Sequence, residues 1–105
     1  MQPGRIGLTA FIICGLLSVP VHAETIQVVI DKLEFAPLEV KAKVGDTIEW
    51  VNKDALLHTA TATNGEWNVS IAPKQNGRLV LNKPGAVDYF CKFHPNMKGR
   101  VVVTP

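Results

Sequence analysis

Hydrophobic and polar positions alternate along most of the chain after its first two dozen residues. In residues 38–44 every second side chain is apolar and those between are charged, which is the period of a half-buried strand. No window shows a convincing amphipathic helix of three turns, and glycine and proline turn signals separate the apolar stretches. We therefore predict an all-β domain, a sandwich or barrel of short strands, with residues 64–74 as a loop that holds at most one short strand. The other expected strands are residues 25–30, 47–52, 78–82, 86–91 and 100–104.

The first 23 residues follow a different pattern. A short basic start is followed by an apolar run over residues 6–19 and by small side chains before and at Ala23. This order is typical of a cleaved secretory signal peptide, and the run is too short to span a bilayer comfortably. We predict cleavage after Ala23, so that residues 1–23 are removed and residues 24–105 form one periplasmic domain without stable membrane insertion.

The net charge of the predicted mature domain argues against some classes of binding partner. The chain has 11 basic and 9 acidic residues, and Arg5 lies in the predicted signal peptide, which leaves 10 and 9 and a net charge of +1. Such a balance provides no bulk attraction to nucleic acid or to an anionic membrane surface. We expect no nucleic-acid binding, and we expect the domain to be a small monomer.

The cysteines supply the first candidate chemistry. Cys14 belongs to the predicted signal peptide, so Cys91 is unpaired in a domain that is exported to an oxidising compartment. An unpaired cysteine there needs a role. His94 and Met97 follow Cys91 within the same seven residues, and the other histidine of the domain, His58, lies 33 positions before Cys91.

Two imidazoles and a thiolate with a weak axial thioether are the ligand set of blue-copper electron-transfer sites. We therefore predict one type 1 copper ion with His58, Cys91, His94 and Met97 as its ligands. The soft sulfur ligands favour Cu(I) and the imidazoles suit Cu(II), so such a site changes little when an electron arrives. Zinc is disfavoured because the methionine thioether is a poor zinc ligand.

Two segments resemble a known family, the cupredoxins, and most closely their amicyanin and plastocyanin branch. Residues 88–103 are similar to the last two strands and the ligand loop of that family, and the Cys-x2-His-x2-Met spacing is the short loop of amicyanins. Residues 44–54 together with His58 form a second block with an Asn-x5-His spacing. With Phe35 and Pro37 upstream, the resemblance covers most of the predicted mature domain. It implies a Greek-key β-sandwich.

The resemblance also implies roles for residues around the ligands. Asn52 would tie the His58 segment to the ligand loop by hydrogen bonds. The edge of His94 would be exposed as the port for electrons, and redox proteins such as a dehydrogenase, a cytochrome or an oxidase would dock around it. The apolar patch at this port would consist of Leu56, Leu57, Pro95 and Phe93.

One residue of the ligand loop departs from the amicyanin pattern, which has proline immediately before the loop histidine. Phe93 stands at that position and, unlike proline, has a backbone N–H. We expect this N–H to point at the sulfur of Cys91. Such a bond would favour Cu(I) by withdrawing electron density from the copper–thiolate bond.

Two functions agree with this sequence. The first is a diffusible one-electron carrier, and the alternative is a periplasmic copper-binding protein for copper delivery or storage. We do not expect an enzyme, because the predicted mature domain has no further histidine for an open substrate position or a second metal.

Overall fold

The computed structural model describes residues 22–105. The predicted signal peptide, residues 1–23, lies outside the described residues except for its last two positions. Within the described range no helix is long and apolar enough to cross a membrane.

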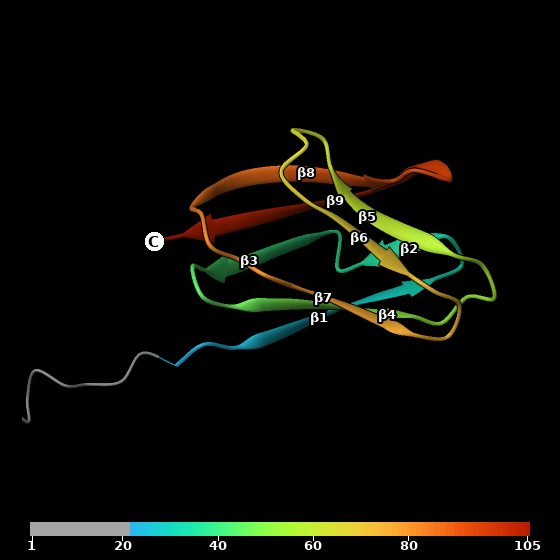
Figure 1. Cartoon of the computed structure of the whole chain (residues 1–105), viewed down its shortest axis with the longest axis horizontal. Helices are drawn as coiled ribbons and strands as arrows, with labels where there is room; N and C mark the ends of the chain where they lie inside the picture. The colour runs from blue at the N-terminus through green and yellow to red at the C-terminus, as the bar shows by residue number, and fades with distance from the viewer. Residues whose placement is uncertain (1–21) are drawn as a thin grey trace, which may run out of the picture.

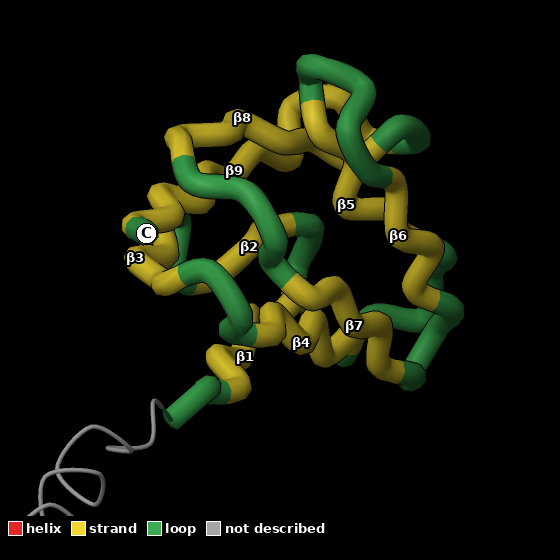
Figure 2. The backbone as a smooth tube through the Cα atoms, turned by 60° about the vertical axis from the view of Figure 1, so that its left-hand side comes forward, coloured by secondary structure: helices red, strands yellow, loops and turns green. Residues whose placement is uncertain are grey.

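The described residues form two β-sheets that face each other (Figures 1 and 2). One sheet has the strand order β2-β1-β4-β7 and the other the order β3-β9-β8-β5-β6. This arrangement confirms the predicted all-β sandwich. The strands are β1 (Thr25–Asp31), β2 (Glu34–Ala36), β3 (Glu39–Lys43), β4 (Thr47–Asn52), β5 (His58–Ala62), β6 (Asn68–Ile71), β7 (Asn76–Val80), β8 (Gly85–Cys91) and β9 (His94–Thr104).

The chain moves repeatedly from one sheet to the other. Strands β1 and β4 pair in parallel, as do β3 and β9, and parallel pairs need crossover connections rather than tight hairpins. Strands β8 and β9 instead form an antiparallel hairpin. The β8–β9 turn and the segment between β4 and β5 therefore come to lie at the same end of the sandwich, on the right in Figure 1.

Aromatic side chains fill the core between the sheets. The Tyr89 ring lies 4.8 Å from that of Phe35 and 5.6 Å from that of Trp50, measured between ring centroids. The Trp50 indole N–H donates a hydrogen bond of 3.3 Å to the Tyr89 hydroxyl, and burial raises the pKa of Tyr89 to about 12. Gly99 on β9 lies against this ring, and a Cβ there would collide with it. Position 99 therefore requires glycine for packing.

The predicted strands at residues 25–30, 47–52 and 86–91 agree with β1, β4 and β8 to within one residue. Strand β6 is the single short strand expected within residues 64–74, and β7 lies two residues earlier than the predicted 78–82.

Three elements differ from expectation. Strand β2 was not predicted because it has only three residues. Strand β5 was missed because its apolar residues are alanines, which are depleted in strands, and because both of its faces are buried. Strand β9 begins at His94 rather than at residue 100, because the ligand segment continues the β8–β9 hairpin almost to its turn.

Candidate metal centre

Three strand ends carry the predicted donors. His58 is the first residue of β5 and Cys91 the last of β8, and both are fully buried. His94, the first residue of β9, is half-buried and pairs in register with Cys91 across a two-residue turn. A register shift between Phe90 and Cys91 precedes this turn. Strand pairing thus brings together side chains that are 33 positions apart in the sequence.

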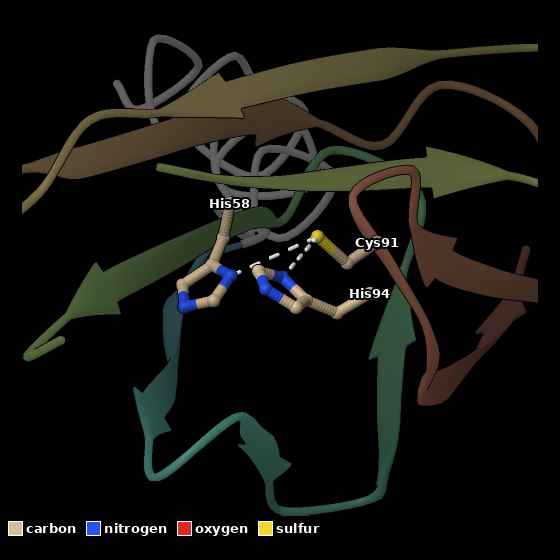
Figure 3. Close-up of side chains that lie close together, drawn as sticks. All are labelled: His58, Cys91 and His94. Carbon is tan, nitrogen blue, oxygen red and sulfur yellow. Dashed lines mark hydrogen bonds between the residues drawn. The ribbon is translucent and has the colours of Figure 1, made fainter. Parts of the chain in front are cut away.

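The donor atoms of these three side chains converge (Figure 3). The Sγ atom of Cys91 lies 3.7 Å from Nδ1 of His58 and 3.8 Å from Nδ1 of His94. All three donor atoms lie within 4.8 Å of one another. Metal–nitrogen and metal–sulfur bonds of about 2.0 and 2.3 Å at a trigonal angle of about 120° separate nitrogen from sulfur by about 3.7 Å. The spacing therefore suits one ion held between the three atoms.

Met97 lies on β9, three residues beyond His94, and only 3% of it is exposed. It lines the same surface pocket as His94, together with Leu33 and Pro95. The fourth predicted ligand is thus a buried side chain at this end of the sandwich, and its role as axial ligand stays a prediction.

A carboxylate contacts the far side of the His58 ring. Oδ2 of Asp54 lies 2.8 Å from Nε2 of His58, and the two Asp54 oxygens also accept hydrogen bonds of 2.8 and 3.1 Å from the backbone N–H groups of Lys32 and Leu33. Burial opposes the charge of Asp54, but these bonds from His58 and from the backbone outweigh it and lower its pKa. Bonding at Nε2 leaves Nδ1 of His58 as the nitrogen that faces Cys91. Sequence reasoning missed Asp54, although a carboxylate four residues before a candidate histidine was a visible signal.

Asn52 braces the segment before His58, but to a different neighbour from the one expected. Its side-chain amide donates to the carbonyl oxygens of Leu56, Ile71 and Ala72 at 2.8, 3.1 and 3.2 Å, and its Oδ1 accepts from the Asp54 N–H at 2.9 Å. These bonds join the β4–β5 segment to the end of β6. The expected tie from Asn52 to the ligand loop is therefore corrected.

Thr59, which sequence reasoning also missed, makes that tie. Its hydroxyl accepts a hydrogen bond of 2.9 Å from the Lys92 N–H, in the turn between Cys91 and His94. Its own N–H donates to the Cys91 sulfur at 3.4 Å. Among the hydrogen bonds of residues 22–105, the backbone donor to this sulfur is Thr59 and not Phe93, the residue from which we expected it. The only sequence signal for Thr59 was its position directly after a candidate ligand histidine.

Exposed apolar side chains surround this end of the molecule. Leu56, Leu57 and Phe93 are 49%, 43% and 57% exposed. Phe93, Pro95 and Leu33 line the pocket that contains His94. Leu33 was not expected in this patch, because the β1–β2 turn that carries it has no sequence link to the ligand loop.

The donor set and its surroundings suit one type 1 copper ion. Two imidazole nitrogens and one cysteine sulfur meet where two of the three side chains are fully buried, and the thioether of Met97 follows on β9. The far nitrogen of His58 and the sulfur of Cys91 each have a hydrogen-bond partner that fixes their orientation.

Comparisons with known proteins agree with this geometry. A family model described as a cupredoxin-like domain matches residues 6–103. Amicyanin-alpha of Methylorubrum extorquens is 37% identical over 87 residues, which cover 77% of this chain and 73% of that protein.

Solved structures show the same likeness. The crystal structure of amicyanin from Paracoccus versutus superposes with a TM-score of 0.66 at 33% identity and covers 83% of this chain and 86% of that one. A purple cupredoxin from Nitrosopumilus maritimus superposes with a TM-score of 0.67 at 26% identity, over 75% of this chain and 99% of that one. The likeness thus extends over most of the chain.

Proposed function

The chain belongs to the cupredoxin family, and we therefore propose that it is a periplasmic blue copper protein that carries single electrons between redox proteins. The observation that supports this most is the convergence of the His58 and His94 Nδ1 atoms on the Cys91 sulfur. We assign these three side chains as the strong ligands of one type 1 copper ion and Met97 as its weak axial ligand. When bound, the ion supplies a reversible one-electron couple between Cu(II) and Cu(I).

In this function the protein fixes the positions of the donor atoms. His58 and Cys91 are fully buried at the ends of paired strands, and Thr59 and Asp54 bond directly to them. A donor set that cannot relax changes little between oxidation states. This rigidity favours fast electron exchange over storage of the metal.

His94 connects the proposed copper site with the protein surface. It is half-buried, whereas His58 and Cys91 have no exposed surface, so its ring is the member of the trio that reaches the protein surface. The exposed side chains of Leu56, Leu57 and Phe93 form an apolar docking patch at the same end. Partners of this patch would be a dehydrogenase, a cytochrome or an oxidase that presents an apolar surface near its own redox group.

The N-terminal segment and the burial of the donors support the proposed location and the proposed role as a carrier. The pattern of residues 1–23 supports export with removal of a signal peptide, which leaves residues 24–105 as the mature domain. We propose no enzymatic activity, because two of the three donors are fully buried and offer no position to a substrate.

The test compares the two functions on one purified protein. The copper-loaded chain is expected to bind one copper ion, to absorb strongly in the visible when oxidised, and to exchange electrons rapidly while a competing chelator removes little metal. Cys91→Ser is the control, and it is expected to fold without the intense visible band. Rapid loss of copper to the chelator together with slow electron exchange would favour copper delivery. A strongly blue Cys91→Ser protein would contradict the ligand assignment.

A further inference from the structure

A buried carboxylate lies at the end of the sandwich opposite the metal centre. Asp46 follows Gly45 in the turn between β3 and β4 and is only 1% exposed. This turn is on the left in Figure 1, beside the start of β1. Buried carboxylates are rare unless they are paired, so the hydrogen-bond partners of Asp46 indicate the role of this side chain.

The first partner is the backbone nitrogen of Glu24, 2.9 Å from Oδ1 of Asp46. Oδ2 accepts from the backbone N–H of Lys43 at 2.8 Å, with the half-exposed Lys43 ammonium further off at 3.7 Å. The carbonyl oxygen of Glu24 in turn accepts from the Thr47 N–H at 2.8 Å. Glu24 is therefore held through both of its backbone groups, one residue before β1 begins.

The nitrogen of Glu24 is also the atom that the predicted cleavage would change. Hydrolysis of the Ala23–Glu24 peptide bond adds one water molecule, breaks the C–N bond, leaves a carboxylate on Ala23 and releases the nitrogen, which takes up a proton. A neutral amide with one hydrogen then becomes a cationic ammonium group with three. Residues 22–25 are exposed, so the two additional hydrogens can reach water.

We propose that Asp46 is a built-in binding site for the α-ammonium group that removal of the signal peptide creates on Glu24. This inference rests on the signal-peptide part of the proposed function and goes beyond it. The contact exists before cleavage as a hydrogen bond from a neutral amide to the Asp46 carboxylate, and cleavage turns it into a hydrogen-bonded pair of opposite charges without moving the chain. Removal of the signal peptide thereby strengthens the contact between the start of β1 and the β3–β4 turn.

The charges around the site agree with this role. The backbone N–H of Glu24 is the main cause that lowers the pKa of Asp46, followed by the N–H of Lys43, so the carboxylate is ionised at neutral pH. The Lys43 ammonium also lies near the carboxylate, 3.7 Å from Oδ2. After cleavage, Coulomb attraction between the ammonium and the carboxylate adds to the hydrogen bond, and partial exposure to water reduces this gain.

The experiment compares two copper-loaded proteins that differ by one residue. One begins at Glu24 and the other at Ala23, so that the nitrogen of residue 24 is an ammonium in the first and an amide in the second. We expect the folding equilibrium constant of the Glu24 protein, from urea unfolding, to be about three- to tenfold larger. We expect the difference to vanish when both carry Asp46→Asn. Equal constants, or a difference that persists with Asp46→Asn, would overturn the proposal.

A second measurement does not depend on whether Asp46→Asn folds. NMR titration of the α-amino group in the Glu24 protein is expected to give a pKa above the ordinary range of about 7.7–8.0, because the ammonium form is paired. A pKa within that range overturns the pairing.

Mass spectrometry of the exported protein then locates its natural N-terminus, with Glu24 as the expected first residue. A start elsewhere overturns the role of Asp46 in the natural protein. The same sample separates this failure from failure of the proposed function, because a blue colour and one bound copper ion would leave the electron carrier in place.

Discussion

Both ring nitrogens of His58 have a neighbour, one at the proposed metal centre and one outside it. The outer neighbour, Asp54, can therefore act on the centre through the His58 ring. Nδ1 faces the Cys91 sulfur at 3.7 Å, and Nε2 lies 2.8 Å from the Asp54 carboxylate. A carboxylate on the far nitrogen makes a histidine a stronger donor and fixes its ring. We therefore expect Asp54 to position the His58 ring and to act electrostatically on a copper ion at this site.

Asp54→Asn is expected to raise the reduction potential while the visible band is retained. Loss of a negative charge close to the site disfavours Cu(II) more than Cu(I), and a tenfold change in that balance corresponds to about 59 mV. Voltammetry at one pH measures the shift, and Asp54→Glu, which keeps the charge, is the control. A potential equal to that of the unaltered protein would show that the carboxylate only supports the β1–β2 turn.

Met97 is expected to adjust the potential more than it holds the metal. A weak axial thioether contributes little binding, so Met97→Leu should keep copper and colour and should raise the reduction potential, because an apolar neighbour destabilises the more charged Cu(II). Leucine has a similar volume and preserves the packing of this buried position. Loss of colour together with a collapse of copper affinity would contradict the axial assignment.

At the scale of strands, Thr59 connects β5 to the β8–β9 turn. Its hydroxyl accepts from the Lys92 N–H at 2.9 Å and lies 2.8 Å from the Thr61 hydroxyl. Thr59 itself is 3% exposed, so water cannot easily replace it. The turn between two proposed ligands thus depends on a side chain of a third strand.

Thr59→Val removes that hydroxyl with little change of shape. We expect a loss of about 1–2 kcal/mol in the free energy of unfolding, because the N–H of Lys92 loses its partner. The backbone bond from residue 59 to the Cys91 sulfur remains, so the visible band should stay. Urea unfolding of Thr59→Val beside Thr59→Ser, which keeps a hydroxyl, separates the bond from packing. Equal losses in both variants would assign the effect to packing instead.

Glu49 connects three strands of the other sheet. Its carboxylate on β4 accepts from Gln27 of β1 at 2.9 Å, and from Arg78 and Asn76 of β7 at 3.1 and 3.3 Å. The bond from Gln27 and then that from Arg78 lower the pKa of Glu49 below its ordinary value. A carboxylate with a lower pKa in the folded state stabilises the fold above its unfolded pKa, about 4.3. That contribution is lost as pH falls through the folded value.

Acid should therefore remove part of the stability of the copper-free protein, and Glu49→Gln should reduce this dependence. We expect Glu49→Gln to be less stable than the unaltered protein at pH 7 and the difference to shrink as pH falls below about 4. Urea unfolding of both proteins at several pH values measures it. A difference that stays constant down to pH 3 would show that the charge of Glu49 does not matter.

For the whole molecule, the two ends of the sandwich have different surfaces. The β4–β5 segment and the β8–β9 turn, which carry the exposed residues Leu56, Leu57 and Phe93, lie at one end, whereas the start of β1 and the C-terminus lie at the other (Figure 1). An apolar patch desolvates easily, so transient complexes can form and separate there at little cost. We therefore expect redox partners to dock at the end that carries the centre.

Leu57→Glu is expected to slow electron exchange with a redox partner about tenfold and to leave the visible spectrum unchanged. A charge in the patch must be desolvated when the complex forms, while the ligands are not touched. Val80→Glu, at an exposed position of β7 that is 61% accessible, is the matched control and should exchange electrons normally. Equal rates for the two variants would place the docking surface elsewhere.

The sequence by itself determined the class of the fold and the identity of the candidate donors. Strand periodicity and turn residues are local properties, so the all-β sandwich and most of its strands could be predicted from them. The Cys-x2-His-x2-Met spacing is local too, and the resemblance to cupredoxins supplied His58 through the Asn-x5-His spacing. The chemistry of these residue types then pointed to one type 1 copper ion.

Only the tertiary structure decided what surrounds the donors. The contacts of Asp54 with Lys32 and Leu33, of Thr59 with Lys92, and of Asp46 with Glu24 join segments 21 to 33 positions apart in the sequence. No local period encodes such pairs, because they arise from which strands the two sheets place side by side. For the same reason Asn52 braces β6 instead of the ligand loop, and Thr59 rather than Phe93 donates to the Cys91 sulfur.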